Sequence, residues 1–166
     1  MRILAISGSL QARSGNLALL QSAASQAPPG VEVTLFDGLR ELPQFNPDLE
    51  ESGPLPVVQA WRDALDRSDG VLIASPEYGF SLPGALKNAI DWVIGTGELE
   101  RKVVALTASV QHPERGRRGL QALQDTLAAL SVTVVGGAPI VRGPSLERDV
   151  AALLEALRRA VHDRRE

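Results

Sequence analysis

The fold of this chain is decided by one stretch, residues Gly70–Trp92, which reads GVLIASPEYGFSLPGALKNAIDW. It begins with a short apolar strand, passes through a loop rich in proline and glycine, and continues with apolar residues at helical spacing. Pro76, Gly79, Pro83 and Gly84 fix an unusual backbone path in that loop. Because open α/β sheets bind ligands at the carboxyl ends of their buried strands, this stretch predicts a ligand site.

Apolar runs of the same kind recur along the chain. They are rich in β-branched residues and bounded by Gly, Ser, Pro or Asp, which favours strands over fragments of helices. The predicted strands are Ile3–Ile6, Val31–Phe36, Val71–Ala74, Val103–Leu106 and Val132–Val135. The segments with helical spacing are Leu17–Ala24, Val57–Leu65, Leu86–Val93, Leu120–Leu130 and Val150–Val161.

This alternation predicts an α/β fold, a doubly wound parallel sheet of five strands with helices on both faces. Such βα units are typical of a flavodoxin-like sheet of order 2-1-3-4-5, although the order comes from fold precedent and not from spacing. The 166 residues are expected to form a single domain, 1–166. Asp37–Pro56 is the one long stretch expected to be irregular, and ordered loops of that length are usually functional or interfacial.

Composition narrows the function classes. Hydrophobic residues make 44% and charged residues 22%, as in ordinary globular chains, and a net charge of −3 gives no support for a nucleic-acid surface. Cysteine is absent, which excludes disulfides, thiolate nucleophiles and Cys-ligated metals, and we predict no metal site. The apolar runs are far shorter than the roughly 20 residues of a membrane span, and the first residues do not resemble a signal peptide. We therefore expect a cytoplasmic protein without nucleic-acid or membrane partners.

The loop after the first strand, Ser7–Asn16, reads SGSLQARSGN and leads into a helix. Hydroxyls, a carboxamide and an arginine gather there beside a helix N-terminus, which favours an anion, most naturally a phosphate. Alternatively, Ser14 or Asn16 is a simple N-cap and the rest is a polar loop. The loop lacks both the Gly-Lys-Ser/Thr of a P-loop and the three spaced glycines of a Rossmann turn.

Two further loops are expected at the same edge of the sheet. In the opening stretch, outward backbone groups and the ring of Tyr78 suit a planar heterocycle with carbonyl and ring-nitrogen groups. In Thr107–Gly119, Ser109 is placed to donate to a ring carbonyl. The arginines of that loop either attract a phosphorylated dinucleotide or an anionic substrate, or are plain solvated surface; they are Arg115, Arg117 and Arg118.

The helix that follows the second loop has two expected faces. Leu86, Ile90, Trp92 and Val93 read as core because their spacing is simply helical. The polar residues between them read as a solvated or interfacial face; they are Lys87, Asn88 and Asp91.

At these residues the chain resembles the NADPH-dependent FMN reductase family, which includes bacterial quinone, chromate and azo-dye reductases. The resemblance rests on Gly8-Ser9-Leu10 with Ser14 and Asn16, on Pro76-Glu77-Tyr78-Gly79, on Pro83-Gly84 with Leu86–Trp92, and on the Pro43–Glu50 loop. Two positions depart from the family. Many relatives carry Arg where this chain has Gln11, so that Arg13 is a candidate substitute, and many carry Asn where it has Gly79.

The resemblance implies a bound FMN whose phosphate is held by Ser9, Ser14 and Asn16, with Gln11 and Arg13 beside them. Pro76, Glu77, Tyr78 and Gly79 would line the isoalloxazine ring, largely through backbone groups, with Ser109 on its other edge. It also implies NADPH or NADH as hydride donor and a small-molecule electron acceptor such as a quinone, chromate, an azo compound or free flavin. Assembly as a homodimer or homotetramer is expected, and no side chain is given a catalytic role because the chemistry takes place on flavin N5.

Two other functions fit parts of the same sequence. A flavodoxin-type electron carrier or flavin-binding regulator would share the fold, but flavodoxins tend to be strongly acidic and to hold phosphate with a Thr-rich loop. A serine hydrolase is suggested by Gly8-Ser9-Leu10, yet it needs a histidine base oriented by an acid. His162 next to Asp163 does not form such a triad by itself, and His112 has no acidic partner in the sequence.

Overall fold

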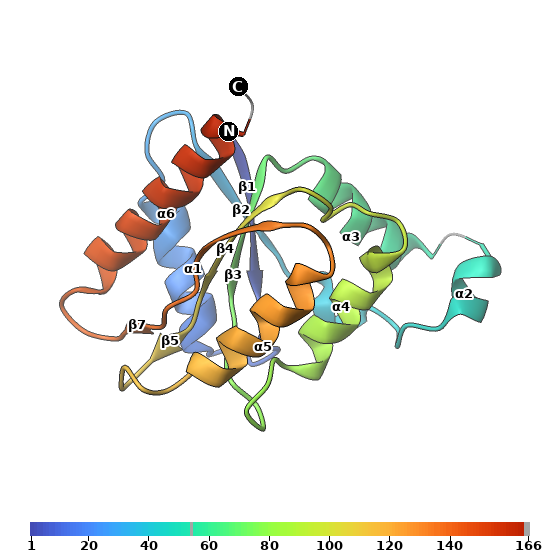
Figure 1. Cartoon of the computed structure of the whole chain (residues 1–166), viewed down its shortest axis with the longest axis horizontal. Helices are drawn as coiled ribbons and strands as arrows, with labels where there is room; N and C mark the ends of the chain where they lie inside the picture. Colours follow the sequence, from blue (N-terminus) through green and yellow to red (C-terminus); the bar gives the residue numbers. More distant parts are fainter. Residues whose placement is uncertain (54, 165–166) are drawn as a thin grey trace.

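The centre of the molecule is a parallel five-stranded sheet, seen in a computed structural model that describes residues 1–53 and 55–164 (Figure 1). Its strands are β1 (Arg2–Ser7), β2 (Glu32–Phe36), β3 (Gly70–Ala74), β4 (Val103–Thr107) and β6 (Thr133–Gly136). They lie in the order β2-β1-β3-β4-β6, which confirms the predicted order 2-1-3-4-5 when the strands of this sheet are counted along the chain. Every end of a predicted strand lies within one residue of the observed end.

Helices cover both faces of the sheet, with α1 and α6 on one face and α3, α4 and α5 on the other (Figure 1). Their bounds are α1 (Gly15–Ser25), α3 (Pro56–Asp66), α4 (Gly84–Ile94), α5 (Arg117–Ala128) and α6 (Leu146–Asp163). Side chains of β3 alternate between two cores: Val71 and Ile73 contact the α3, α4 and α5 side, whereas Leu72 contacts the α1 and α6 side. This double burial explains why the strands read as continuous apolar runs.

The Asp37–Pro56 stretch is more ordered than predicted. It holds a 3₁₀ turn, η1 (Gly38–Glu41), and a short helix, α2 (Pro47–Glu51), which lies apart from the sheet in Figure 1. Asn46 caps α2 by accepting a hydrogen bond from the Asp48 N–H at 3.0 Å, and Pro47 occupies the first helical position. A helix of five residues has no apolar period, so only this cap could have indicated it. Pro54, one of the prolines behind the prediction, lies outside the described residues.

Helix α4 confirms the predicted core face, because Leu86, Ile90, Trp92 and Val93 are buried. The prediction of a solvated or interfacial residue was wrong for Asn88, which is 6% exposed. Its amide oxygen accepts from the Phe45 N–H at 2.7 Å and its amide nitrogen donates to the Pro43 carbonyl at 2.9 Å. Asn88 therefore fastens the segment after η1 to the helix that follows loop 75–83.

Helix α6 is the longest helix of the described chain, and its exposed side is strongly charged. Arg158 and Arg159 both donate to Glu155, at 2.8 and 3.0 Å, and these contacts lower the pKa of Glu155 to about 2, with the Arg158 hydrogen bond the larger cause. None of the helices within residues 1–53 and 55–164 is both long and apolar enough to cross a bilayer.

Replacement of Asn88 tests how this segment is anchored. We expect Asn88→Ala to lower the free energy of unfolding by about 2 kcal/mol, because the backbone N–H of Phe45 loses its buried acceptor. Urea denaturation measures the effect. Lys87→Ala is the matched control on the same helix, and it should cost no more than about 0.5 kcal/mol, since Lys87 makes only a partly exposed pair with Asp91. Equal losses in the two variants would contradict the anchoring role.

Candidate functional site

Three loops meet at the carboxyl edge of the sheet, as the sequence predicted. They are loop 1 (residues 8–14), loop 2 (residues 75–83) and loop 3 (residues 108–116). Loop 1 is joined to the β3 end by the Gly8 N–H, which donates to the Ala74 carbonyl at 2.9 Å. The start of α1 is joined to loop 3 by the Ser109 N–H, which donates to the side-chain oxygen of Asn16 at 2.8 Å. The candidate residues of all three loops are thus brought to one edge.

The hydroxyl groups of loop 1 organise its own backbone. Ser14 is the N-cap of α1, where its Oγ accepts from the Asn16 N–H at 3.2 Å, and Ser9 Oγ accepts from the Gln11 N–H at the same distance. The N-cap alternative therefore holds for Ser14, while the buried side chain of Asn16 reaches loop 3 instead. A cap and an anion site are compatible, since the other N–H groups of the first helical turn have no partner inside the helix.

Loop 2 contains a tight two-residue turn. The backbone N–H and C=O of Tyr78 and Ser81 bond each other reciprocally at 3.0 Å, and the residues between them, Gly79 and Phe80, have φ of +56° and +63°. These values are typical of a type I′ turn, in which the first position strongly prefers glycine or asparagine. The turn accounts for Gly79, and asparagine would also fit this position. It exposes two aromatic side chains, Tyr78 at 54% and Phe80 at 66%.

The side chain of Glu77 is committed to the fold. Its carboxylate accepts from the Gly119 N–H at 3.0 Å in the first turn of α5, where the helix dipole favours a negative charge. Gly119 permits this approach, because a Cβ there would lie 2.9 Å from the Cα and Cβ of Glu77. This hydrogen bond holds the Glu77 side chain against α5, so that we expect a ligand to contact mainly its backbone. No pattern in the sequence indicates this cap, nor the position of the Arg118 guanidinium, which lies 4.4 Å from the centre of the Phe80 ring.

Loop 3 begins with a feature that the sequence did not predict. Strands β5 (Ser109–Val110) and β7 (Ile140–Val141) form a separate parallel pair, and this pair places Arg142 beside the start of α1. A Cβ built on Gly15 would lie 3.5 Å from the Arg142 Cζ and 3.1 Å from the Ser109 Oγ. That buried hydroxyl has no hydrogen-bond partner in the described parts of the chain, which in a folded protein calls for an explanation.

The three loop arginines that sequence reasoning grouped together have different surroundings. Arg117 pairs with Glu114 at 3.3 Å, which fits the plain-surface alternative, and Arg118 lies over Phe80. Arg115 lines a recess of about 360 Å³ together with His112 and Arg142. The loop therefore presents one shared basic recess and two arginines engaged within the chain.

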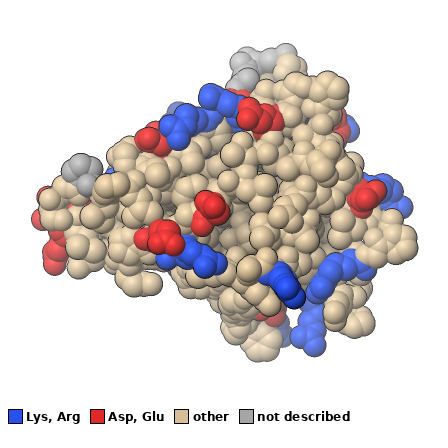
Figure 2. Space-filling view, turned by 180° about the vertical axis from the view of Figure 1, so that it is seen from behind, with Lys and Arg blue, Asp and Glu red and all other residues tan. Residues whose placement is uncertain are grey.

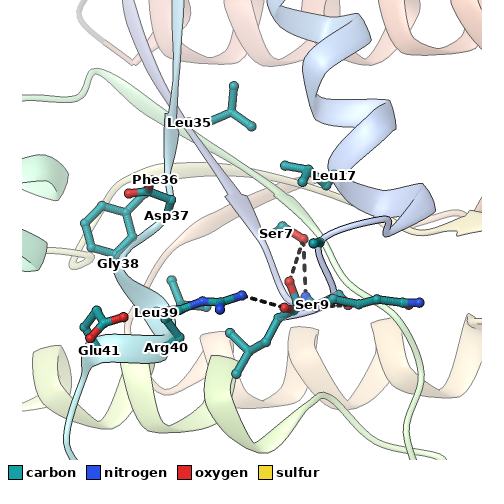
Figure 3. Close-up of a pocket in the computed structure, with 13 residues that line it drawn as sticks. Ser7, Ser9, Leu17, Leu35, Phe36, Asp37, Gly38, Leu39, Arg40 and Glu41 are labelled. Carbon is teal, nitrogen blue, oxygen red and sulfur yellow. Dashed lines mark hydrogen bonds between the residues drawn. The ribbon is translucent and has the colours of Figure 1, made fainter.

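Two cavities flank loop 1. Figure 3 shows the first, of about 380 Å³, which is lined by Gln11 and by the carboxylates of Asp37 and Glu41. Arg40 points into loop 1 there and donates to the Leu10 carbonyl at 2.8 Å. The second, of about 400 Å³, is lined by Arg13, Ser14, Gly15, Ser109 and Arg142, and none of its described lining residues is acidic. Gln11 and Arg13 thus line different cavities.

A family model for NADPH-dependent FMN reductases matches residues 1–143. The chain belongs to this family. An NAD(P)H-dependent FMN reductase of Pseudomonas aeruginosa is 42% identical over 92 residues, which cover 55% of this chain and 49% of the relative. A quinone reductase of Escherichia coli is 33% identical over 94 residues, covering 56% and 50% of the two chains. The chain thus spans about half the length of the curated relatives it matches.

Solved structures show the same fold. The flavoenzyme NAD(P)H:(acceptor) oxidoreductase FerB of Paracoccus denitrificans superposes with a TM-score of 0.80 at 24% identity, over 95% of this chain and 97% of that one. An oxidoreductase of Corynebacterium diphtheriae superposes with a TM-score of 0.73 at 18% identity, over 98% of each chain. The flavodoxin-like fold class is confirmed, and the family implies FMN and NAD(P)H as its cofactors.

Gly79 gives a test of the turn in loop 2 without any packing effect, because a Cβ there would meet nothing within 4 Å. We expect Gly79→Ala to lower the free energy of unfolding by about 1 kcal/mol, the usual penalty of a left-handed conformation for an L-residue. Gly79→Asn should cost clearly less, since asparagine tolerates this region. Thermal melting of both variants compares them, and an equal cost for Asn and Ala would rule out the turn as the reason for this residue.

Proposed function

We propose that this chain binds FMN at the carboxyl edge of its sheet and acts as an NAD(P)H-dependent oxidoreductase that reduces a quinone or a similar small-molecule acceptor. The observation that carries the proposal is the meeting of an N-capped helix, an exposed aromatic turn and loop 3 at one edge, joined by the hydrogen bond between Ser109 and Asn16. Family membership and the names of the relatives support it.

The free polar groups at this edge fit the two ends of FMN. The unpartnered Ser109 Oγ, the first turn of α1, Arg13 and Arg142 would supply donors for the phosphate. Ser109 is thus proposed for the phosphate and not for the ring edge that the resemblance implied. In loop 2 the backbone of Tyr78 is used within the turn, so that contacts with ring oxygens and nitrogens fall to its neighbours. The N–H groups of Glu77 and Gly79 have no acceptor among the described residues.

The chain's own residues would bind and orient FMN and leave the flavin accessible to its substrates. Bound FMN would accept hydride from NAD(P)H at N5 and pass the reducing equivalents to the acceptor. The aromatic turn of Tyr78 and Phe80 lies at the surface, so it offers a flat apolar contact that two substrates can use in turn. No side-chain base or nucleophile is required, which agrees with the absence of cysteine.

The hydrolase alternative lacks a histidine beside Ser9, because His112 of loop 3 lines the recess with Arg115 and Arg142, whose described lining does not include Ser9. Ser9 Oγ accepts from the Gln11 N–H, while His162 follows Val161, which lies against Gly70 at the amino end of β3. His162 and Ser9 are therefore at opposite edges of the sheet. The electron-carrier alternative would use the same flavin site. Only a measurement of catalytic turnover distinguishes such a carrier from an enzyme.

Turnover without a partner reductase is the test of the proposed function. We expect the purified chain to take up FMN with a flavin absorption spectrum, and then to oxidise NADPH or NADH when a quinone is added. Chromate and an azo dye, assayed in parallel, define the acceptor, and the two nucleotides define the donor. A chain that binds FMN but turns over neither nucleotide would be an electron carrier; one without saturable FMN binding would lie outside flavin chemistry.

Tyr78 tests the proposed contact with the ring. Tyr78→Ala should weaken FMN binding about tenfold, since aromatic contacts contribute about 1 kcal/mol or more beyond simple burial. Tyr78→Phe is the matched control and should bind FMN within about twofold of the wild type, because it keeps the ring. The fold should survive both changes, as this side chain is largely exposed. Flavin fluorescence titration measures the affinities, and unchanged binding in Tyr78→Ala would remove this residue from the site.

We also propose a homodimer or homotetramer that uses the 37–56 segment. The described part of that segment exposes the apolar side chains of Phe45 and Leu49. Light scattering after gel filtration measures the mass, and a monomer at micromolar concentration would contradict the assembly.

A further inference from the structure

We propose that Arg142, which lies outside the loops that the sequence predicted as ligand sites, supplies the positive charge that neutralises the FMN phosphate. The inference rests on the proposed function, that the chain binds FMN. It assigns the role to a residue after β7, far from loop 1 in the sequence.

The backbone around Arg142 is fixed by β5. The Ile140 N–H donates to the Ala108 carbonyl and the Arg142 N–H donates to the Val110 carbonyl, both at 2.8 Å. The guanidinium then lies against the first residue of α1, with Cζ 3.5 Å and Nε 3.6 Å from the position that a Cβ on Gly15 would take. The cation is therefore in contact distance of the helix N-terminus, and the tighter neighbour of that Cβ position is the Ser109 Oγ at 3.1 Å.

The electrostatics of this arrangement call for an anion. The N-terminus of a helix carries partial positive charge, so a nearby cation is unfavourable unless a negative group lies between them. No carboxylate within the described residues forms an ion pair with Arg142. Ser109 Oγ, buried at the same place, also lacks a partner there. Helix N–H groups, guanidinium and hydroxyl are all available as donors, and a phosphate would accept from them together.

The two cavities beside loop 1 differ in their charged residues, and this difference favours a phosphate beside Arg142 over one beside Gln11. The cavity that Gln11 lines contains Asp37 and Glu41, and its arginine, Arg40, is bound to the Leu10 carbonyl. Arg142 lines the second cavity and the recess of Arg115, and neither has an acidic residue among its described lining. Figure 2 shows basic side chains gathered at the lower right of the molecule, the end that holds β5 and β7 in Figure 1. A phosphate is favoured on the Arg142 side, where a charge at position 11 is not needed.

Comparison of FMN with riboflavin isolates the phosphate. We expect Arg142→Ala to raise the dissociation constant of FMN about 30-fold, the usual scale of a charge-assisted contact, while that of riboflavin changes less than about twofold. Arg142→Lys should fall between the variant and the wild type, since it keeps the charge without the planar fork. Arg67→Ala is the control, because it removes an exposed arginine that follows α3 at the opposite edge. Fluorescence titrations at low and at physiological salt supply the constants.

The stability of the flavin-free chain gives a second readout. We expect Arg142→Ala without flavin to melt at the same temperature as the wild type or higher, because it relieves repulsion at the α1 N-terminus. The rise in melting temperature that FMN produces should be smaller in the variant. A merely structural Arg142 would instead lower the melting temperature of the flavin-free chain and weaken both flavins together.

Three outcomes overturn the inference. Arg142→Ala with unchanged FMN affinity removes this residue from the phosphate site, and equal weakening of FMN and riboflavin gives it a structural role. A selective loss of FMN in Arg13→Ala but not in Arg142→Ala assigns the charge to Arg13. A wild-type chain that binds neither flavin overturns the proposed function itself. That result differs from failure of the Arg142 inference alone, in which the wild type binds FMN and the Arg142→Ala variant binds it equally well.

Discussion

Burial of β3 on both faces is the constraint on which the rest of the structure depends. All five of its residues are buried, with Val71 and Ile73 on one core and Leu72 and Ala74 on the other. Gly70 starts the strand because a Cβ there would lie 2.9 Å from Val161 of α6. A strand enclosed in this way can present polar groups only at its ends. The loops at the carboxyl edge, where β1, β3 and β4 end side by side, are therefore where we propose the ligand site.

Within those loops, some polar groups form hydrogen bonds inside the chain and others form none among the described residues. Ser14, Asn16, the Glu77 carboxylate and the Tyr78 backbone all bond within the chain, and they hold the loops in shape before any ligand arrives. Among the described residues, the donors without a partner include Ser109 Oγ and the N–H groups of Glu77 and Gly79, and Arg142 forms no ion pair there. A site built in this way is preorganised for an acceptor-rich ligand with an anionic end, which is the chemical character of FMN.

The sequence predicted the elements whose signal is periodic or local. Five apolar strands, their order by precedent, the N-cap of α1 as one of two alternatives and the unusual backbone path at Gly79 follow from patterns that a few neighbouring residues carry. The parts it missed depend on contacts between distant segments. Two-residue strands such as β5 have no period, and the burial of Asn88 depends on a loop 43 residues away. Arg142 reads as a surface arginine until the fold brings it to Gly15.

Backbone amide NMR of the chain titrated with FMN tests the central claim most directly, because it reports every loop at once. The predicted result is saturable shifts in the N–H signals of residues 8–16, 75–81, 108–110 and 142, with the opposite edge around Arg67 and Gly70 unchanged. Shifts confined to the acidic cavity of Asp37 and Glu41, or centred on the opposite edge, would contradict a flavin site at the carboxyl edge of this sheet.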